Sequence, residues 1–162
     1  MRILIINPPI RLTDKPRHLP HGLAILANLI RKKLKITPEF LDINAYRYTL
    51  AEVKEILRSI EYDVVLIGGL IPVYKRITAY ADIIKKINPN SIIIAGGSAA
   101  MSVPDLLLDN SVVDVVCAGE GEKVIIKLLE GLQSHSLENL TRIKGFYYKV
   151  NNEIIFSGSP DL

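Results

Sequence analysis

Short apolar runs alternate along the chain with longer segments in which apolar residues recur every three or four positions. Five of the short runs are rich in β-branched residues, and several are apolar at consecutive positions, a pattern typical of strands buried on both faces of a sheet. These runs cover residues 2–6, 39–43, 63–67, 91–95 and 113–117. Helical spacing is found over residues 22–34, 50–60, 73–87, 103–108 and 120–132. We therefore predict a β-α unit repeated five times.

This repetition predicts an α/β fold, a doubly wound (flavodoxin-like or Rossmann-like) five-stranded parallel sheet with helices on both faces. Two alternating runs at 145–150 and 153–156, joined by Asn151-Asn152, predict a C-terminal β-hairpin. We expect an α/β domain over residues 1–142, the hairpin packed on it over 143–157, and a linker stub over 158–162. Ligands of such sheets bind at the carboxyl ends of the strands, so the loops that follow the strands are the candidate site.

Composition agrees with one packed domain and narrows its partners. The chain has 162 residues, of which 49% are hydrophobic and 23% charged. The net charge of +3 is spread along the chain, so a nucleic-acid surface is not indicated. No apolar stretch approaches the roughly 20 residues of a membrane helix, and we expect a cytoplasmic protein without a membrane partner. Cys117, the single cysteine, falls in an apolar run that predicts a buried, inert thiol.

The loop after the first strand, residues 7–21 and here called the first loop, is long for a βα connection, which usually takes about 2–6 residues. It contains four prolines and two histidines. A ligand-binding role is one interpretation, and stiffening of a surface connection is the other. The residues that we select as candidates in and beside it are Asn7, Pro8, Pro9, Pro20 and Gly22.

The third and fourth predicted strands both end in a glycine pair, in Gly68-Gly69-Leu70 and Gly96-Gly97-Ser98. Backbone without side chains at two neighbouring strand ends would allow a bulky ligand to lie directly against it. Each pair taken singly is explained equally well by a tight turn that needs positive φ. Two pairs at one edge favour the ligand.

The fifth predicted strand leads into Gly119-Glu120-Gly121-Glu122. Carboxylates at a helix N-terminus are stabilised by the helix dipole, so capping alone would explain the glutamates. We include Gly119, Glu120 and Gly121 among the binding candidates, although the motif in isolation is more typical of a structural role. Asp42 and Asn44, after the second strand, are interpreted mainly as turn residues.

Several familiar sites are missing from the sequence. It has neither the P-loop nor the dinucleotide glycine fingerprint, and Asn-Pro-Pro stands after the first strand instead. The acidic and phosphoacceptor positions of a receiver domain are not present, nor is a Ser/Thr-rich flavin phosphate loop. No Gly-x-Ser-x-Gly or His-Glu-x-x-His motif indicates hydrolysis. We expect a binding module with no catalytic residue of its own.

An ordered set of short motifs resembles the N-terminal cobalamin-binding domain of class B radical S-adenosylmethionine (SAM) enzymes, the cobalamin-dependent methyltransferase-like family. The motifs extend over essentially the whole chain. They are Ile-Ile-Asn-Pro-Pro at 5–9, Pro-His-Gly-Leu at 20–23, Leu-Asp-Ile at 41–43, Tyr-Asp-Val-Val at 62–65, Ile-Ile-Ala-Gly-Gly at 93–97 with its neighbouring Asn-Pro, Pro104, Val-Asp-Val-Val at 113–116, Gly-Glu-Gly-Glu at 119–122 and Ile-Lys-Gly at 143–145.

The resemblance implies cobalamin as the cofactor, with the corrin across the strand ends and the nucleotide tail beside the sheet near the first, third and fourth strands. The Asp-x-His-x-x-Gly motif that supplies a cobalt ligand in many cobalamin domains is absent, which implies base-off binding without a histidine ligand. Arg17, His18 and His21 are nearby, but we interpret each as a surface residue and predict no metal ligand.

The family also implies a C-terminal radical SAM barrel as a partner in the same full-length protein. That missing domain would hold the iron–sulfur cluster and SAM, because the Cys-x3-Cys-x2-Cys signature is absent here. The complete enzyme is expected to be a methyltransferase. Two alternatives stay open: the same fold with cofactor binding lost, acting as a substrate-recognition or interaction module, and a small-molecule or nucleotide-sugar binding half of another α/β enzyme.

Overall fold

The protein forms one α/β layer structure in the computed structural model, which describes residues 1–11, 19–133 and 143–159. The helices are α1 (His21–Leu34), α2 (Ile43–Tyr46), α3 (Leu50–Ser59), α4 (Tyr74–Ile87), α5 (Gly97–Ser102), α6 (Pro104–Asn110) and α7 (Gly121–Gln133), with a 3-10 turn η1 (Ile71–Val73) before α4. The strands are β1 (Ile3–Asn7), β2 (Glu39–Asp42), β3 (Val64–Gly68), β4 (Ile92–Gly96), β5 (Val115–Cys117), β6 (Phe146–Val150) and β7 (Glu153–Phe156).

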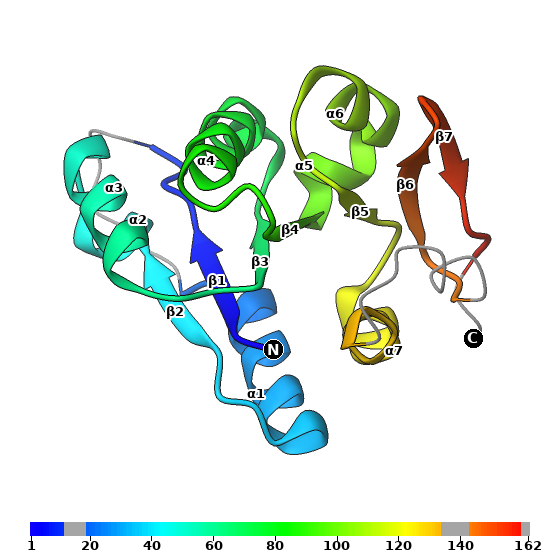
Figure 1. Ribbon diagram of the computed structural model, residues 1–162, viewed down its shortest axis with the longest axis horizontal. Helices are drawn as coiled ribbons and strands as arrows, with labels where there is room; N and C mark the ends of the chain where they lie inside the picture. The colour runs from blue at the N-terminus through cyan, green and yellow to red at the C-terminus, as the bar shows by residue number, and fades with distance from the viewer. Residues whose placement is uncertain (12–18, 134–142, 160–162) are drawn as a thin grey trace.

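The strand order confirms the doubly wound α/β fold. The sheet runs β2-β1-β3-β4-β5-β6-β7, and its first five strands are parallel (Figure 1). The direction of winding reverses between β1 and β3, which is the point where open α/β sheets bind their ligands.

The five predicted parallel strands are present, but the sheet has seven strands rather than five, because the hairpin extends it. Strand β6 pairs antiparallel with β5, and β7 pairs antiparallel with β6, which makes seven strands. Phe146 lies opposite Cys117 and is fully buried. The backbone donors and acceptors along the outer edge of β5 thus find partners in β6, which sequence periodicity alone does not reveal.

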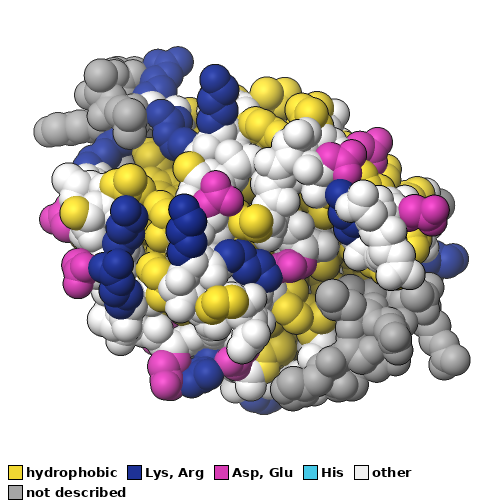
Figure 2. Space-filling model, turned by 45° about the horizontal axis from the view of Figure 1, so that its top comes forward, with side chains coloured by type: hydrophobic (Ala, Val, Ile, Leu, Met, Phe, Trp, Pro, Cys, Tyr) yellow, Lys and Arg dark blue, Asp and Glu magenta, His cyan; other side chains and the backbone are white. Residues whose placement is uncertain are grey.

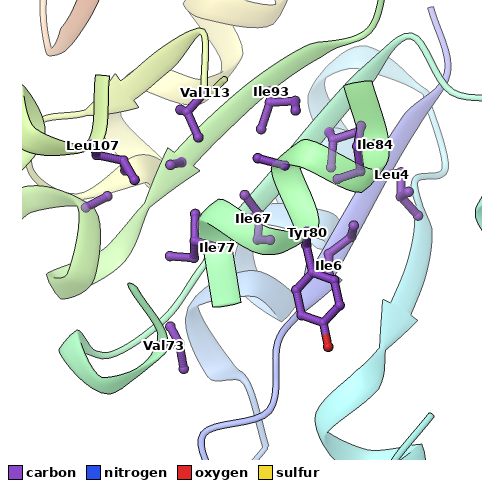
Figure 3. Close-up of a cluster of buried hydrophobic side chains, with 14 of the residues drawn as sticks. Leu4, Ile6, Ile67, Val73, Ile77, Tyr80, Ile84, Ile93, Leu107 and Val113 are labelled. Carbon is purple, nitrogen blue, oxygen red and sulfur yellow. The ribbon is translucent and has the colours of Figure 1, made fainter. Parts of the chain in front are cut away.

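Two helical layers cover the sheet (Figure 1). Helices α3, α4, α5 and α6 pack on one face around Ile6, Ile67, Ile77 and Ile93, as the close-up in Figure 3 shows for much of this core. Helices α1 and α7 pack on the other face against the side chains that alternate with these. The five residues of β1 and the five of β3 are all buried, as expected for strands covered on both sides.

Three short elements were missed by the periodicity: α2, η1 and α5. Residue Ile43 was expected to end a strand, but Asp42 caps a helix there, with its carboxylate accepting from the Ala45 N–H at 2.8 Å. Gly97 and Ser98 were expected in a loop and instead begin α5. Elements of one or two turns are too short to display a hydrophobic period. Within the described residues, no helix has the length and apolarity needed to cross a membrane.

Candidate functional site

A cleft of about 620 Å³ lies at the carboxyl ends of β1, β3, β4 and β5. It extends from the sheet edge into the space between the sheet and helices α1 and α7, where Leu66, Ile94, Leu26 and Ile125 face it. Most of the atoms that line it are apolar. An apolar cleft of this size at the switch point of a doubly wound sheet is the expected form of a small-molecule or cofactor site.

The floor of the cleft is backbone. Gly68 and Gly96 stand opposite each other on β3 and β4, in register. Leu66 and Ile94, two positions before these glycines, face α1 and α7. Side chains two positions apart on a strand share a face, so a side chain at either glycine would also point toward α1 and α7. The two glycines therefore leave the sheet edge uncovered where a ligand can approach it.

Close approach of two chain segments explains why glycine is needed at Gly68. A Cβ atom built there would lie 2.7 Å from the carbonyl oxygen of Gly96. At Gly97 the Cβ would lie 2.7 Å from the carbonyl oxygen of Gly69, and φ is +77°, a value that favours glycine. The Ala99 N–H donates to that same Gly69 oxygen at 3.1 Å. Of the four paired glycines only Gly97 has positive φ; backbone contact explains Gly68, and a Cβ at Gly69 would lie 2.9 Å from the Val73 side chain.

Gly96 differs from Gly68 because space remains beside it. A Cβ at Gly96 would meet only the Cβ of Cys117, at 3.7 Å, which is ordinary contact. Cys117 is 5% exposed and lines the cleft from β5. Burial, with a smaller contribution from the nearby Glu122 carboxylate, raises the pKa of the Cys117 thiol to about 12. The buried, protonated thiol agrees with the inert role predicted for it.

The described beginning of the first loop forms one wall of the cleft. Asn7, Pro8 and Ile10 line it, together with Asn44 from α2. The Asn7 side-chain nitrogen donates to the Asp42 carboxylate at 2.8 Å, and the Ile10 N–H donates to the Asn44 side-chain oxygen at 3.3 Å. Asp42 and Asn44 were interpreted mainly as turn residues. Asp42 does cap α2, but the two side chains also hold the wall in place.

The N-terminus of α7 forms the opposite rim. Gly119, Glu120, Gly121 and Glu122 all line the cleft. Gly119 has φ of +108°, and a Cβ at Gly121 would lie 3.3 Å from the Leu26 side chain of α1. The glycines thus permit the entry turn and a close α1–α7 contact. Glu122 lies in the first turn of α7, where helix capping was predicted for it.

The structure brings almost all of the predicted binding residues together. Every one of them except Pro9 lines the cleft; Pro9 is buried, and its carbonyl oxygen faces Arg76 of α4. Whether these residues contact a ligand stays a prediction. His21 is exposed on the rim at the start of α1, whereas Arg17 and His18 lie outside the described residues. Over the described ranges, no group of three or more His, Cys, Asp or Glu side chains is arranged to hold a metal ion.

The apolar walls of the cleft were missed at the sequence level. Leu23, Leu26, Leu66, Ile94 and Ile125 fall on the apolar stripes of their helices and strands, so their pattern is the same as that of core residues. These residues line a cleft instead of filling a core only because α1 and α7 stand away from the strand ends and leave space there.

An open doubly wound sheet with an apolar cleft at its switch point defines an α/β cofactor-binding or ligand-binding domain. The B12 binding domain family matches residues 9–129, and the chain belongs to that family. The predictions of a cobalamin-binding domain and of cobalamin as its cofactor are thereby confirmed.

Two curated relatives are longer than this chain. It is 28% identical over 159 residues to the "Uncharacterized methyltransferase PH0819" of Pyrococcus horikoshii, an alignment that covers 95% of this chain and 34% of the relative. It is 22% identical over 138 residues to the anaerobic magnesium-protoporphyrin IX monomethyl ester cyclase of Cereibacter sphaeroides, covering 84% of this chain and 22% of the relative. The chain thus spans about a third or less of the relatives that it matches.

Solved structures of two cobalamin enzymes share the fold. The cobalamin-dependent radical SAM enzyme OxsB, with aqua-cobalamin and SAM bound, superposes with a TM-score of 0.84 at 17% identity over 99% of this chain and 22% of OxsB. The radical SAM methyltransferase TsrM of Kitasatospora setae superposes with a TM-score of 0.81 at 15% identity over 98% of this chain and 30% of TsrM. The chain resembles the cobalamin-binding domains of cobalamin-dependent radical SAM methyltransferases.

The residues present fit such a cofactor. A corrin is flat and bulky, and the glycine floor at Gly68 and Gly96 would admit it to the strand ends because no side chain stands there. The apolar space between the sheet and α1 and α7 is open, whereas bulky side chains filling it would have indicated a lost site.

Proposed function

We propose that this chain binds cobalamin base-off at the carboxyl edge of its sheet, without a cobalt ligand from its own histidines, as the cofactor-carrying domain of a larger radical SAM methyltransferase. The observation that carries the proposal is the open apolar cleft at the β1/β3 switch point, floored by Gly68 and Gly96, in a member of the B12-binding family. The residues that would hold the cofactor are those already selected from the sequence and found to line this cleft.

Base-off binding is supported by the residues that face the cleft. The sequence has three histidines and no Asp-x-His-x-x-Gly motif. His21 is the histidine that lines the cleft in the described part of the chain, and it stands exposed on the rim. A nucleotide tail placed in the apolar space between the sheet and α7 would be held away from the cobalt. The high pKa of Cys117 keeps this thiol protonated, so it does not compete as a thiolate ligand.

Two buried amides are candidates to recognise the carboxamide groups on the rim of a corrin. Asn7 and Asn44 are 8% and 6% exposed. A carboxylate only accepts hydrogen bonds, so Asp42 fixes the Asn7 amide with its nitrogen toward the carboxylate and leaves the amide oxygen for a ligand donor. Asn44 has the reverse arrangement, because its oxygen accepts from the Ile10 N–H and its nitrogen is left as the donor.

The larger enzyme is inferred from size and cysteine content. When bound, cobalamin supplies a cobalt centre that can carry a methyl group between a donor and an acceptor. One cysteine cannot form a three-cysteine cluster site, so radical chemistry would require a further domain that holds the iron–sulfur cluster and SAM. The two longer relatives, of which the alignments cover 34% and 22%, support such a domain, and the name of one of them includes methyltransferase.

Titration of the purified 162-residue chain with hydroxocobalamin, followed by visible absorbance, tests binding. Electron paramagnetic resonance of the bound cofactor, after reduction to cobalt(II), tests the axial ligand. We expect saturable binding and cobalt hyperfine lines without nitrogen superhyperfine splitting, because no nitrogen coordinates the cobalt axially.

Nitrogen splitting that is lost in His21→Ala would identify that histidine as a cobalt ligand and contradict the proposal that no histidine coordinates the metal. Splitting that persists when the histidines are replaced would come from the cofactor's own base and contradict base-off binding. Absence of any spectral change at high micromolar cofactor, in both this chain and the longer protein that contains it, would instead favour an interaction module that has lost the cofactor.

A further inference from the structure

Side chains from α2 and α4 hold the described beginning of the first loop. Arg76 of α4 donates through Nη1 to the carbonyl oxygens of Pro9 and Ile10, at 2.7 and 2.8 Å. Arg47, which follows α2, donates to the carbonyl oxygen of Arg11, and Asn44 of α2 accepts from the Ile10 N–H. We call Arg76, Arg47 and Asn44 the first-loop clamp.

The backbone in this segment needs such partners. Strand β1 ends at Asn7, so the carbonyl groups that follow have no ladder partner in the sheet. Pro9 is buried, and a buried carbonyl without a donor is costly. A guanidinium group has five N–H donors in a rigid plane and no acceptor, which suits it to bridge consecutive carbonyls. One arginine therefore donates hydrogen bonds to two consecutive carbonyl groups that lie beyond the end of the strand.

The clamp connects the cleft wall to the opposite helical layer. Pro8 and Ile10 line the cleft. Arg76 belongs to the first turn of α4, and in the sequence it lies between Val73 and Ile77, which are both fully buried. Helix α4 packs on the sheet face opposite α1 and α7 (Figure 1). The position of this cleft wall is thus determined by α4, which packs in the core on the opposite face of the sheet.

We propose that Arg76 is a positioning residue for the cofactor, which holds the segment around Pro9 and Ile10 as a preformed wall of the cleft before the ligand arrives. This inference rests on the proposed function, because it concerns how tightly the cleft binds cobalamin. Without the bridge, the segment around Pro9 and Ile10 would have to be ordered during binding, and that ordering weakens affinity. Loss of hydrogen bonds from a charged donor predicts an affinity at least about tenfold lower.

The effect of the Arg76 charge on cofactor affinity has to be distinguished from the effect of its hydrogen bonds to the Pro9 and Ile10 carbonyl groups. Figure 2 shows many Lys and Arg side chains on the face that includes α4, with fewer acidic ones between them. Lys75, the neighbour of Arg76 on the same helix, is exposed. Lys75→Met removes the same charge from the same turn without touching the bridge, and it is the matched control for Arg76→Met.

The experiment is a hydroxocobalamin titration of the wild-type chain, Arg76→Met, Arg76→Lys and Lys75→Met, combined with amide hydrogen exchange of the cofactor-free proteins. We expect Kd to rise at least about tenfold in Arg76→Met, to rise less in Arg76→Lys, which keeps one donor group, and to stay within about twofold in Lys75→Met. Exchange should accelerate in the peptide that contains Ile10 and Arg11 but not in β3 or β4, and cobalamin should restore its protection.

Unchanged affinity and unchanged exchange of this peptide in Arg76→Met would overturn the proposal. Exchange that accelerates equally in all strands would also overturn it, because it would indicate a merely structural role. If Arg76→Met does not fold, Arg76→Lys is measured by the same two readouts and decides in the same way. Failure of the wild-type chain and of Lys75→Met to bind would refute the proposed function instead, so the two failures are distinguishable.

Discussion

Gly68 and Gly96 occupy equivalent positions on neighbouring strands, but a side chain at each would meet different surroundings. At Gly68 the first added carbon would collide with the Gly96 carbonyl oxygen at 2.7 Å, whereas at Gly96 it would make ordinary contact with Cys117 at 3.7 Å. Gly96 has extended φ of −147°, which any residue adopts. Glycine is therefore required by the fold at Gly68, whereas at Gly96 only a ligand would require the free space.

We expect Gly96→Leu to fold and to lose cobalamin affinity at least tenfold, because its side chain would occupy the cleft floor. Gly68→Ala should instead destabilise the fold by about 1–3 kcal/mol through overpacking against backbone. Urea unfolding and hydroxocobalamin titration of both variants measure the two effects. Normal cofactor binding by Gly96→Leu would show that the cofactor does not lie on this floor.

Cys117 gives a pH-dependent probe of the same cleft. The thiolate is the reactive form, and with a pKa of about 12 only roughly one thiol in ten thousand is ionised at pH 8. We expect alkylation of the cofactor-free protein to be slow at pH 8 and to accelerate about tenfold for each pH unit below that pKa. Bound cobalamin should slow it further by covering the residue.

Mass spectrometry after timed reaction with iodoacetamide gives the rates, and free cysteine is the control for the reagent. A rate at pH 8 close to that of free cysteine would contradict the buried, protonated thiol. Equal rates with and without saturating cobalamin would argue against occupation of the cleft beside β5.

Among the elements, the C-terminal hairpin contributes to the core in a way that the sequence pattern did not predict. Its strand β6 contributes Phe146, which is 0% exposed and packs with the residues under α1 and α7. Strand β7 contributes Phe156, which is 45% exposed and stacks on Tyr147 with ring centroids 4.6 Å apart. The two phenylalanines of one hairpin therefore make a matched pair.

We expect Phe146→Ala to lower the free energy of unfolding by about 3–5 kcal/mol, the usual cost of removing a fully buried phenylalanine. Phe156→Ala should cost about 1 kcal/mol, because its ring is half exposed and loses mainly the stacking contact. Equilibrium urea unfolding by circular dichroism measures both. Equal and small effects would mean that the hairpin does not contribute to the core.

The periodicity predicted the strands and the longer helices and missed only short helical elements. The spacing of apolar residues predicted α1, α3, α4 and α7 to within one residue at each end. It missed α2, η1 and α5, which are held by local contacts such as the Asp42 cap and the Leu70 carbonyl that accepts from Val73. Such contacts join residues three apart and leave no hydrophobic period in the sequence.

For the molecule as a whole, binding and folding are linked. A ligand that binds only the folded state stabilises it by about 2.7 kcal/mol when its free concentration is 100 times Kd. We expect urea unfolding of the chain to shift by this amount when cobalamin is added at that ratio. Gly96→Leu is the control and should show a much smaller shift at the same cofactor concentration. An equal shift in both proteins would place the bound cofactor elsewhere.

The order of elements, the burial of the strands on both faces and the edge that carries the candidate site were determined by the sequence. Consecutive apolar residues demand cover on both sides, and parallel strands bring their carboxyl ends to one edge. The glycine pairs at 68–69 and 96–97 could also be identified from the sequence, because the lack of a side chain is a property of the residue itself.

Tertiary structure alone decided the rest. Residues distant in sequence had to be brought together before Arg76 could meet the carbonyl groups of Pro9 and Ile10, before Asp42 could orient Asn7, and before β6 could pair with β5. The cleft itself is space left between α1, α7 and the sheet, and apolar side chains that line a space have the same sequence pattern as those that fill a core.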